Sequence, residues 1–354
     1  MFKYDNVIRV EVELTTICQA ACPQCPRNMY GGKVIDDLPI QSWTIDQFMT
    51  VFTADVLNHI KMIYFCGTYG DPLACKDLVS ICEYAKQVAP DIRIGLHTNG
   101  GLGSTDVFAK LANCTDIIAF GIDGLEDTNH VYRRNVQWHK VIENAKSFID
   151  AGGHAEWDFI VFEHNQHQVE MAKKISEQLG FDKFNIKKTS RFFNKQHEIV
   201  DQVDVQNTQG EYEYSIRPPT DQKYLNNATI KWQDTDIKSY LKNTCITCHS
   251  LNNRWIYVDH AGNVFPCGWT SDRMYGYEAK QTGDYNRIRT LMNQAGTEYV
   301  NVNHNSLQNI VNGPWFQILH DSWTNENRLQ RCAAMCGDKI NAISEQNEQI
   351  DYQI

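Results

Sequence analysis

Short apolar runs alternate with amphipathic segments through the first half of the chain, and this alternation constrains the fold most. β-Branched and aromatic residues dominate the apolar runs, which is typical of buried strands. The expected strands cover residues 7–14, 62–67, 92–98, 116–123, 156–162 and 183–189. The segments between them have helical spacing, and two of them run into a glycine, Gly152 or Gly180. Strands alternating with helices in short repeats predict a parallel sheet with right-handed crossovers.

The number of repeats limits the architecture. About six units form a partial barrel, since a closed eight-unit barrel needs about 250 residues. The repeats stop near residue 191, so we expect an α/β fold with a partial (β/α)6 TIM-like barrel over residues 1–191. Residues 192–240 are polar with little periodicity and indicate a connector. Residues 241–354, where cysteines return, are the expected second domain.

Three cysteines directly follow the first expected strand, at Cys18, Cys22 and Cys25. Thiolate is the soft ligand that iron–sulfur clusters require, and three thiolates can hold three irons of a cubane. The fourth iron would then be open to a further ligand. Structural zinc also takes closely spaced thiolates, but it needs four closed ligands and usually shows C-x2-C pairs. The spacing therefore favours a cluster over zinc.

Composition places the chain in a broad class. Twelve cysteines in 354 residues are too dilute for a disulfide scaffold, and no export signal opens the sequence. No apolar run reaches the roughly 18 residues that a membrane span requires. These features predict a cytoplasmic protein with no membrane partner. The net charge of −10 is spread without a basic run, which argues against a nucleic-acid surface.

Glycine, asparagine and aspartate gather where the expected strands end. Gly70 and Asp71 follow the second strand, Asn99 follows the third, and Asp123 follows the fourth. Taken singly, such residues are typical of turns. The carboxyl ends of parallel strands share one edge, however, and chemistry collects there in α/β folds. Together with the cysteine loop, these strand ends predict one ligand cavity.

The chain here resembles a known family, the radical S-adenosylmethionine (SAM) superfamily. The resemblance covers residues 7 to about 190 and rests on the three-cysteine loop and on residues 69–72, 98–100 and 121–124. It implies a 4Fe–4S cluster whose open iron chelates the amino and carboxylate groups of SAM. Reductive cleavage of SAM would release a 5′-deoxyadenosyl radical that takes a hydrogen atom from the substrate. A reductant such as flavodoxin or ferredoxin is the implied partner.

The resemblance also implies which residues bind SAM. Gly70 and Asp71 would lie at the amine, and Asn99 and Asp123 near the ribose or the carboxylate. Arg133 or Arg134 would pair with the carboxylate, because a guanidinium binds it in bidentate geometry. The chain departs from the family at two positions. Asp71 stands where glutamate is common, and Gln24 stands where an aromatic residue usually borders adenine, which leaves the adenine pocket unassigned.

A second group of cysteines lies near the C-terminus. Its members are Cys245, Cys248, Cys267, Cys332 and Cys336. Two short strands joined by a turn at residues 260–263 would bring Cys248 close to Cys267. The C-x2-C and C-x3-C pairs also suit tetrahedral zinc, so the local pattern leaves zinc and a cluster equally open.

Resemblance favours a cluster at this second site. The spacing Cys248-x13-Gly262-x4-Cys267 is similar to the opening of the SPASM and twitch extensions that hold auxiliary 4Fe–4S clusters. The full SPASM run is absent, so we expect a twitch-like domain with one auxiliary cluster. Its implied ligands are Cys248, Cys267, Cys332 and Cys336. Cys245 could replace one of them, and a cluster held by Cys245, Cys248 and Cys267 alone would keep an open iron.

The expected protein is thus a radical SAM enzyme with an auxiliary cluster that accepts an electron or anchors substrate. Its substrate class would be a peptide or protein side chain, or a small polar metabolite, and no residue selects between them. The alternative is a non-catalytic iron–sulfur or zinc protein that serves as an interaction module. The intact three-cysteine loop argues against this alternative, because a binding module has no need for an open iron.

Overall fold

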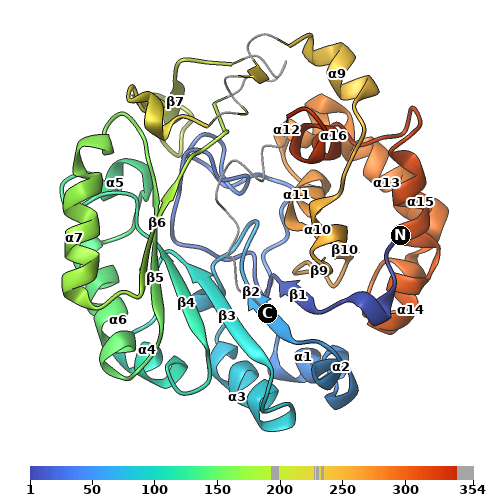
Figure 1. Cartoon of the computed structure of the whole chain (residues 1–354), viewed down its shortest axis with the longest axis horizontal. Coiled ribbons are helices and arrows are strands. Elements are labelled where there is room, and N and C mark those ends of the chain that lie inside the picture. Colours follow the sequence, from blue (N-terminus) through green and yellow to red (C-terminus); the bar gives the residue numbers. More distant parts are fainter. Residues whose placement is uncertain (193–198, 227, 229–230, 233–234, 341–354) are drawn as a thin grey trace.

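An eight-stranded sheet lies at the centre of the molecule, in the order β10-β9-β1-β2-β3-β4-β5-β6. The computed structural model describes residues 1–192, 199–226, 228, 231–232 and 235–340. Neighbouring strands pair in parallel except β10, which is antiparallel to β9. The sheet curves as a partial barrel with helices along its outer side (Figure 1). The expected α/β fold with a parallel sheet is confirmed.

Six of these strands come from the repeats in the first half of the chain. They are β1 Arg9–Val12, β2 Met62–Phe65, β3 Arg93–Thr98, β4 Ile117–Gly121, β5 Ala155–Ile160 and β6 Lys183–Lys187. Each lies inside an expected run, apart from β5, which begins one residue earlier. Apolar runs long enough for a strand and bounded by turn residues therefore predicted the strands well.

Helices connect the strands of the repeats. They are α1 Ile45–Val51, α2 Ala54–His59, α3 Leu78–Val88, α4 Thr105–Leu111, α5 Asn129–Tyr132, α6 Trp138–Asp150 and α7 Val169–Leu179. A capping box begins α1, where the Thr44 hydroxyl accepts from the amide of Gln47 and the Gln47 side chain accepts from the amide of Thr44. Gly180 ends α7 with φ +87°, a left-handed conformation that favours glycine.

The second half of the chain adds two hairpins and a group of helices. The strands are β7 Val203–Gln206, β8 Tyr212–Ile216, β9 Trp255–Val258 and β10 Val264–Phe265. The helices are α9 Ile237–Asn243, α10 His249–Asn252, α11 Gly268–Ser271, α12 Tyr277–Thr282, α13 Asp284–Ala295, α14 Leu307–Asn312, α15 Pro314–Ser322 and α16 Gln330–Cys336.

Single 3-10 turns occur in both halves of the chain. They are η1 Tyr4–Asn6, η2 Pro72–Ala74, η3 Gln166–Gln168, η4 Gln222–Tyr224, η5 Asp272–Met274 and η6 Thr297–Tyr299.

The hairpin β7–β8 lies within the segment expected to be a connector. Its strands alternate in side-chain direction, and Val205 and Ile216 on one face are buried. Gly210 in the turn has φ +85°. The alternation of apolar or aromatic residues with polar ones in Val203–Gln206 and Tyr212–Ile216 is a strand signal, but it was missed because the surrounding segment is polar overall.

The hairpin β9–β10 was expected, and the structure confirms it. Its first strand pairs in parallel with β1, from Arg9 opposite Trp255 to Val12 opposite Val258, so it extends the barrel sheet.

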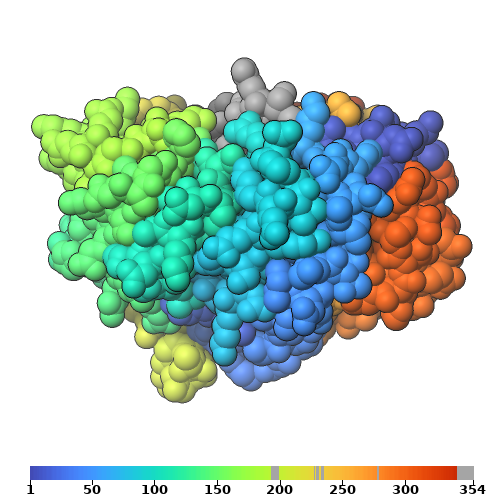
Figure 2. Space-filling model, turned by 90° about the horizontal axis from the view of Figure 1, so that it is seen from below, coloured from blue at the N-terminus to red at the C-terminus, as the bar shows by residue number. Residues whose placement is uncertain are grey.

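The start of the chain packs on the C-terminal helices. The Phe2 and Phe316 rings are 4.8 Å apart, and the Tyr4 amide donates to Asn312 over 2.9 Å. Figure 2 shows the N-terminal residues in blue beside the C-terminal helices in orange, at one edge of the molecule. The division near residues 191 and 240 stays a prediction.

The two faces of the sheet differ in chemistry. Side chains on the outer face pack under the helices as one apolar core, with Phe65, Leu96 and Trp157 fully buried. Inner-face positions alternate with them along each strand, and several are polar, including His97 and Asp158. Barrel interiors are usually filled by branched apolar residues, so this inner face is the place to look for a site. Among the described residues, no helix is both long and apolar enough to cross a membrane.

Candidate functional site

The cysteine loop after β1 lies against the ends of the neighbouring strands. The Cys18 sulfur accepts from the side-chain amide of Asn99, which follows β3, over 3.5 Å. The Cys25 sulfur is 4.0 Å from the carbonyl oxygen of Thr68, which follows β2. The structure therefore brings together the thiols and the strand ends that the sequence predicted to share a cavity.

Arg133 connects Cys22 to the end of β4. Its Nη1 is 4.0 Å from the Cys22 sulfur, and its Nε donates to Asp123 over 2.6 Å. Asp123 is fully buried, and its other oxygen accepts from the amide of Ile160. A Cβ at Gly121 would lie 2.4 Å from the guanidinium, so a larger residue there would displace Arg133 from its present position. Arg133 thus presents one positive charge next to the cysteines, already paired with one carboxylate.

Asp71 lies in a saturated hydrogen-bond network. Its carboxylate accepts from the amide and side chain of Asn99 over 2.8 and 2.7 Å, and from the Thr98 hydroxyl over 2.8 and 2.9 Å. Its Oδ1 also accepts from the amide of Leu73. Burial raises the pKa of this carboxyl, and the hydrogen bonds from Asn99 and Thr98 oppose the shift. The carboxylate therefore orders the loop and Asn99 directly.

The side chain of Arg134 points toward the hairpin β7–β8. It pairs with Glu213 over 2.6 Å and donates to the carbonyl of Gln206 over 3.2 Å, both in the hairpin β7–β8. Its guanidinium also lies 5.6 Å from the centre of the Tyr214 ring. Of the two arginines, Arg133 is the one whose side chain lies beside the cysteine loop, whereas Arg134 contacts that loop through its carbonyl oxygen, which accepts from the amide of Ala21 over 3.2 Å.

Gly70 and its surroundings include a residue that the sequence analysis missed. A Cβ at Gly70 would collide with the carbonyl oxygen of Thr15, so the loop after β2 packs directly on the backbone after β1. One carboxylate oxygen of Glu13 accepts from the amides of Tyr69 and Gly70, over 2.5 and 3.2 Å. The signal was available, because Glu13 is an acidic residue at an inner-face position in an otherwise buried segment.

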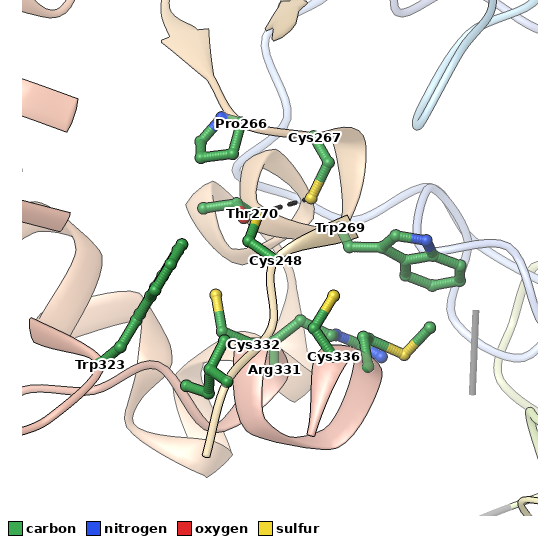
Figure 3. Close-up of a pocket in the computed structure, with 11 residues that line it drawn as sticks. Cys248, Pro266, Cys267, Trp269, Thr270, Trp323, Arg331, Cys332 and Cys336 are labelled. Atoms are coloured by element: carbon green, nitrogen blue, oxygen red, sulfur yellow. Dashed lines mark hydrogen bonds between the residues drawn. The ribbon is translucent and has the colours of Figure 1, made fainter. Parts of the chain in front are cut away.

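A second set of thiols lines one cavity (Figure 3). Cys332 and Cys336 lie four residues apart on α16, and helical geometry puts such residues on one face. Cys267 stands at the N-terminus of α11 and Cys248 at that of α10. Trp269 and Trp323 flank the cavity. The four cysteines expected to hold the auxiliary cluster are therefore neighbours in space.

Cys245 does not line this cavity. Its side chain is exposed, whereas Cys248 and Cys336 are buried. Its carbonyl oxygen accepts from the amide of Asp338 over 2.9 Å, so its backbone is tied to the segment after α16. The structure thus separates Cys245 from the other four.

Both sets of thiols lie in surroundings that favour their protonated form. Burial, with a smaller contribution from a neighbouring thiol in each case, raises the pKa of the Cys22 thiol to about 11 and that of Cys336 to about 12, and at Cys22 the charge of Arg133 opposes the shift. A metal must therefore supply the charge that keeps these sulfurs as thiolates. Among the described residues, no three Cys, His, Asp or Glu side chains converge on a single ion.

Polar side chains on β3, β5 and β6 line the inner face beside the cysteine loop. Asp158 is 3.4 Å from the Lys187 ammonium and 3.8 Å from the His97 ring, and it accepts from Asn185 over 2.9 Å. The Asp158 and Lys187 side chains are almost fully buried, whereas His97 is 41% exposed. Although part of the ring faces the barrel interior, the surrounding protein desolvates it and lowers the pKa of His97 to about 4, against the opposing charge of Asp158 and with a further contribution from Arg133 and Lys187. His97 is thus a neutral, accessible imidazole near neutral pH.

Comparison with protein families identifies the first half of the chain. The sequence model of the Radical SAM superfamily matches residues 12–174, which contain the first cysteine loop and strands β2 to β5. No curated protein sequence matches the chain.

Solved structures share the fold at low identity. The crystal structure of Streptococcus suis SuiB is 12% identical with a TM-score of 0.51, and covers 75% of this chain. SuiB bound to its precursor peptide SuiA has a TM-score of 0.50 at 12% identity, and covers 74% of this chain. Native anSMEcpe with bound AdoMet is 17% identical with a TM-score of 0.50; the match covers 74% of this chain and 75% of that one. The chain spans about 60% of the length of the SuiB structures.

Proposed function

We propose that this chain, whose residues 12–174 are a radical SAM domain, generates a carbon radical from SAM and removes a hydrogen atom from its substrate. The domain makes the protein an iron–sulfur enzyme and implies a 4Fe–4S cluster and SAM as cofactors. When bound, they supply a 5′-deoxyadenosyl radical and methionine, at the expense of one electron from an external reductant such as flavodoxin or ferredoxin. The substrate takes part by losing one hydrogen atom.

One observation carries the proposal: the thiols of Cys18, Cys22 and Cys25 lie against residues that follow three other strands. Three thiolates leave one iron of a cubane without a protein ligand. Asn99 and Arg133 sit at this loop and would orient the amino and carboxylate groups of SAM. Arg133 offers further donors beyond the one that pairs with Asp123. Asp71 would act by holding Asn99 and the loop in place.

The substrate would lie along the inner face of β3, β5 and β6. Asp158, Lys187 and Asn185 form a buried network on this face, and such a network costs stability unless every group is paired. His97 is the member of this network that a substrate could reach, because its side chain is exposed. A polar substrate group could take a hydrogen bond from or to this imidazole. The polar lining supports a small polar metabolite or a polar peptide side chain as substrate class.

The second set of cysteines would hold one auxiliary 4Fe–4S cluster. Its proposed ligands are Cys248, Cys267, Cys332 and Cys336, because these four line one cavity. Four protein ligands leave no iron open, so the cluster would accept an electron from the substrate radical. The net reaction would then be an oxidation that consumes one SAM for each product. The twitch-like character of residues 241–354 is part of this proposal.

The test is reductive cleavage of SAM. Anaerobically reconstituted protein, given SAM and dithionite, should release 5′-deoxyadenosine and methionine, slowly even without substrate. The variant in which Cys18, Cys22 and Cys25 are all alanine should release neither. A matched control replaces Cys75, Cys82 and Cys114, which are buried in the apolar core, and should keep the activity. Full cluster loading without either product would favour the binding-module alternative.

A further inference from the structure

Glu13 joins the ends of three adjacent strands. It follows β1 directly, and its amide donates to the carbonyl oxygen of Val258 on β9. Its Oε1 accepts from the amides of Tyr69 and Gly70 after β2. Its Oε2 is 2.9 Å from Nδ1 of His260, in the turn between β9 and β10. One carboxylate therefore ties the C-terminal hairpin to the loop after β2.

His260 is fully enclosed at this junction. Its side chain has no exposed surface, and its carbonyl oxygen accepts from the indole of Trp43 over 2.8 Å. The rings of Tyr69 and Tyr275 pack against it at 5.9 and 5.5 Å. Its Nε2 has no hydrogen-bond partner among the described residues. The ring thus has one polar contact, the Nδ1 proton given to Glu13, which also fixes the orientation of the carboxylate.

We propose that His260 is a positioning residue that, through Glu13, holds the backbone of Tyr69 and Gly70 where SAM binds. This inference rests on the proposed function, because it takes the loop after β2 as part of the SAM site. A buried carboxylate that accepts two backbone amides fixes their direction. The imidazole keeps the carboxylate turned toward them, so residues from opposite halves of the chain set the geometry of one loop.

The experiment uses three variants of the full chain. His260→Leu removes the proton donor, His260→Gln keeps a donor of similar reach, and Glu13→Gln removes the negative charge that accepts it. The matched control is His139→Leu, since His139 pairs with Glu126 on the exposed surface. Hydrogen exchange at the amides of Tyr69 and Gly70 is measured in cluster-free protein, and SAM affinity is measured by calorimetry after reconstitution.

In His260→Leu we expect both amides to exchange about tenfold faster and SAM to bind about tenfold more weakly, as loss of one buried hydrogen bond predicts. His260→Gln should restore most of both values, and His139→Leu should change neither. If His260→Leu does not fold, the same two measurements on Glu13→Gln decide the case. Unchanged exchange in a folded variant overturns the inference, and so does a His260→Gln that behaves like His260→Leu.

Failure of the inference and failure of the proposed function give different results. If the wild type binds no SAM and yields no 5′-deoxyadenosine, the proposed function fails, while amide exchange still reports on the link between His260 and the loop. If the wild type cleaves SAM and the variants exchange and bind as it does, only the positioning role fails.

Discussion

At the scale of single residues, the site depends on carboxylates whose hydrogen bonds are already satisfied within the protein. Asp71, Asp123 and Glu13 are buried, and each accepts from backbone amides at a strand end. A buried carboxylate is stable only when paired in this way. These residues therefore shape the cavity, while the thiols and Arg133 supply the groups that would bind cofactors.

Asp71→Ala should weaken SAM binding and leave the iron content unchanged. The variant releases Asn99 and Thr98 from a charge-assisted network, and one such bond is worth about 1.5–3 kcal/mol, so affinity should fall roughly ten- to a hundred-fold. Calorimetry with SAM and a chemical iron assay measure both quantities. Asp46→Ala, which removes an exposed carboxylate at the start of α1, is the control. An unchanged affinity in Asp71→Ala would reject the role of this strand end.

His97 makes stability depend on pH in a defined window. Its folded pKa is lowered to about 4 by burial, whereas an unfolded histidine has a pKa of about 6.5. Between these values the unfolded chain binds more protons, so the free energy of unfolding should fall as the pH drops from 6.5 to 4. Urea unfolding of cluster-free protein should show a shallower decline in His97→Gln than in the wild type. Equal slopes in this window would contradict the low pKa, which an NMR titration of His97 measures directly.

At the scale of secondary structure, short elements place the second set of thiols. Helix α16 puts Cys332 and Cys336 on one face, and the starts of α10 and α11 bring Cys248 and Cys267 opposite them (Figure 3). The hairpin β9–β10 joins those two helices. Because β9 pairs with β1, the second cavity is fixed to the same sheet as the first cysteine loop.

Single-cysteine variants test the second set. Cys336→Ser should remove the iron of the auxiliary site, because Cys336 lines the cavity, and Cys245→Ser should keep it, because Cys245 is exposed. The two changes form a matched pair. Iron analysis and Mössbauer spectra, in a background without Cys18, Cys22 and Cys25, make the comparison. Loss of iron in Cys245→Ser with retention in Cys336→Ser would instead indicate an open cluster that anchors substrate.

At the scale of the whole molecule, two sets of thiols on one sheet predict the total iron content. Reconstituted wild type should hold about eight irons and the triple variant of the first loop about four, as expected for one cubane per set. Acid-labile sulfide should match the iron in both proteins. A colourless protein that holds zinc and no sulfide would contradict both cluster assignments.

The sequence predicted the six strands of the repeats, the parallel sheet and the hairpin at residues 260–263, because these depend on local apolar patterns, and it missed the hairpin β7–β8. It also predicted that Asn99 and Asp123 lie near the cysteine loop, because parallel strands end at one edge. It did not show that β9 pairs with β1, or that the side chain of Arg133 rather than that of Arg134 lies at the loop. These facts depend on contacts between residues far apart in the chain, which leave no local pattern. Glu13 could have been noticed as an acidic residue at an inner-face position, but its partners could not be predicted, since they follow other strands.

The pairing of β9 with β1 has a consequence for how the protein is made. During synthesis, β1 emerges first, and one of its edges stays unpaired until about 250 residues have followed it. Contacts between such distant segments form late and slow folding. Until then, the loop with Cys18, Cys22 and Cys25 lies beside an open strand edge that is prone to wrong pairing. The arrival of the hairpin therefore pairs the last open edge of β1 and protects it from wrong partners.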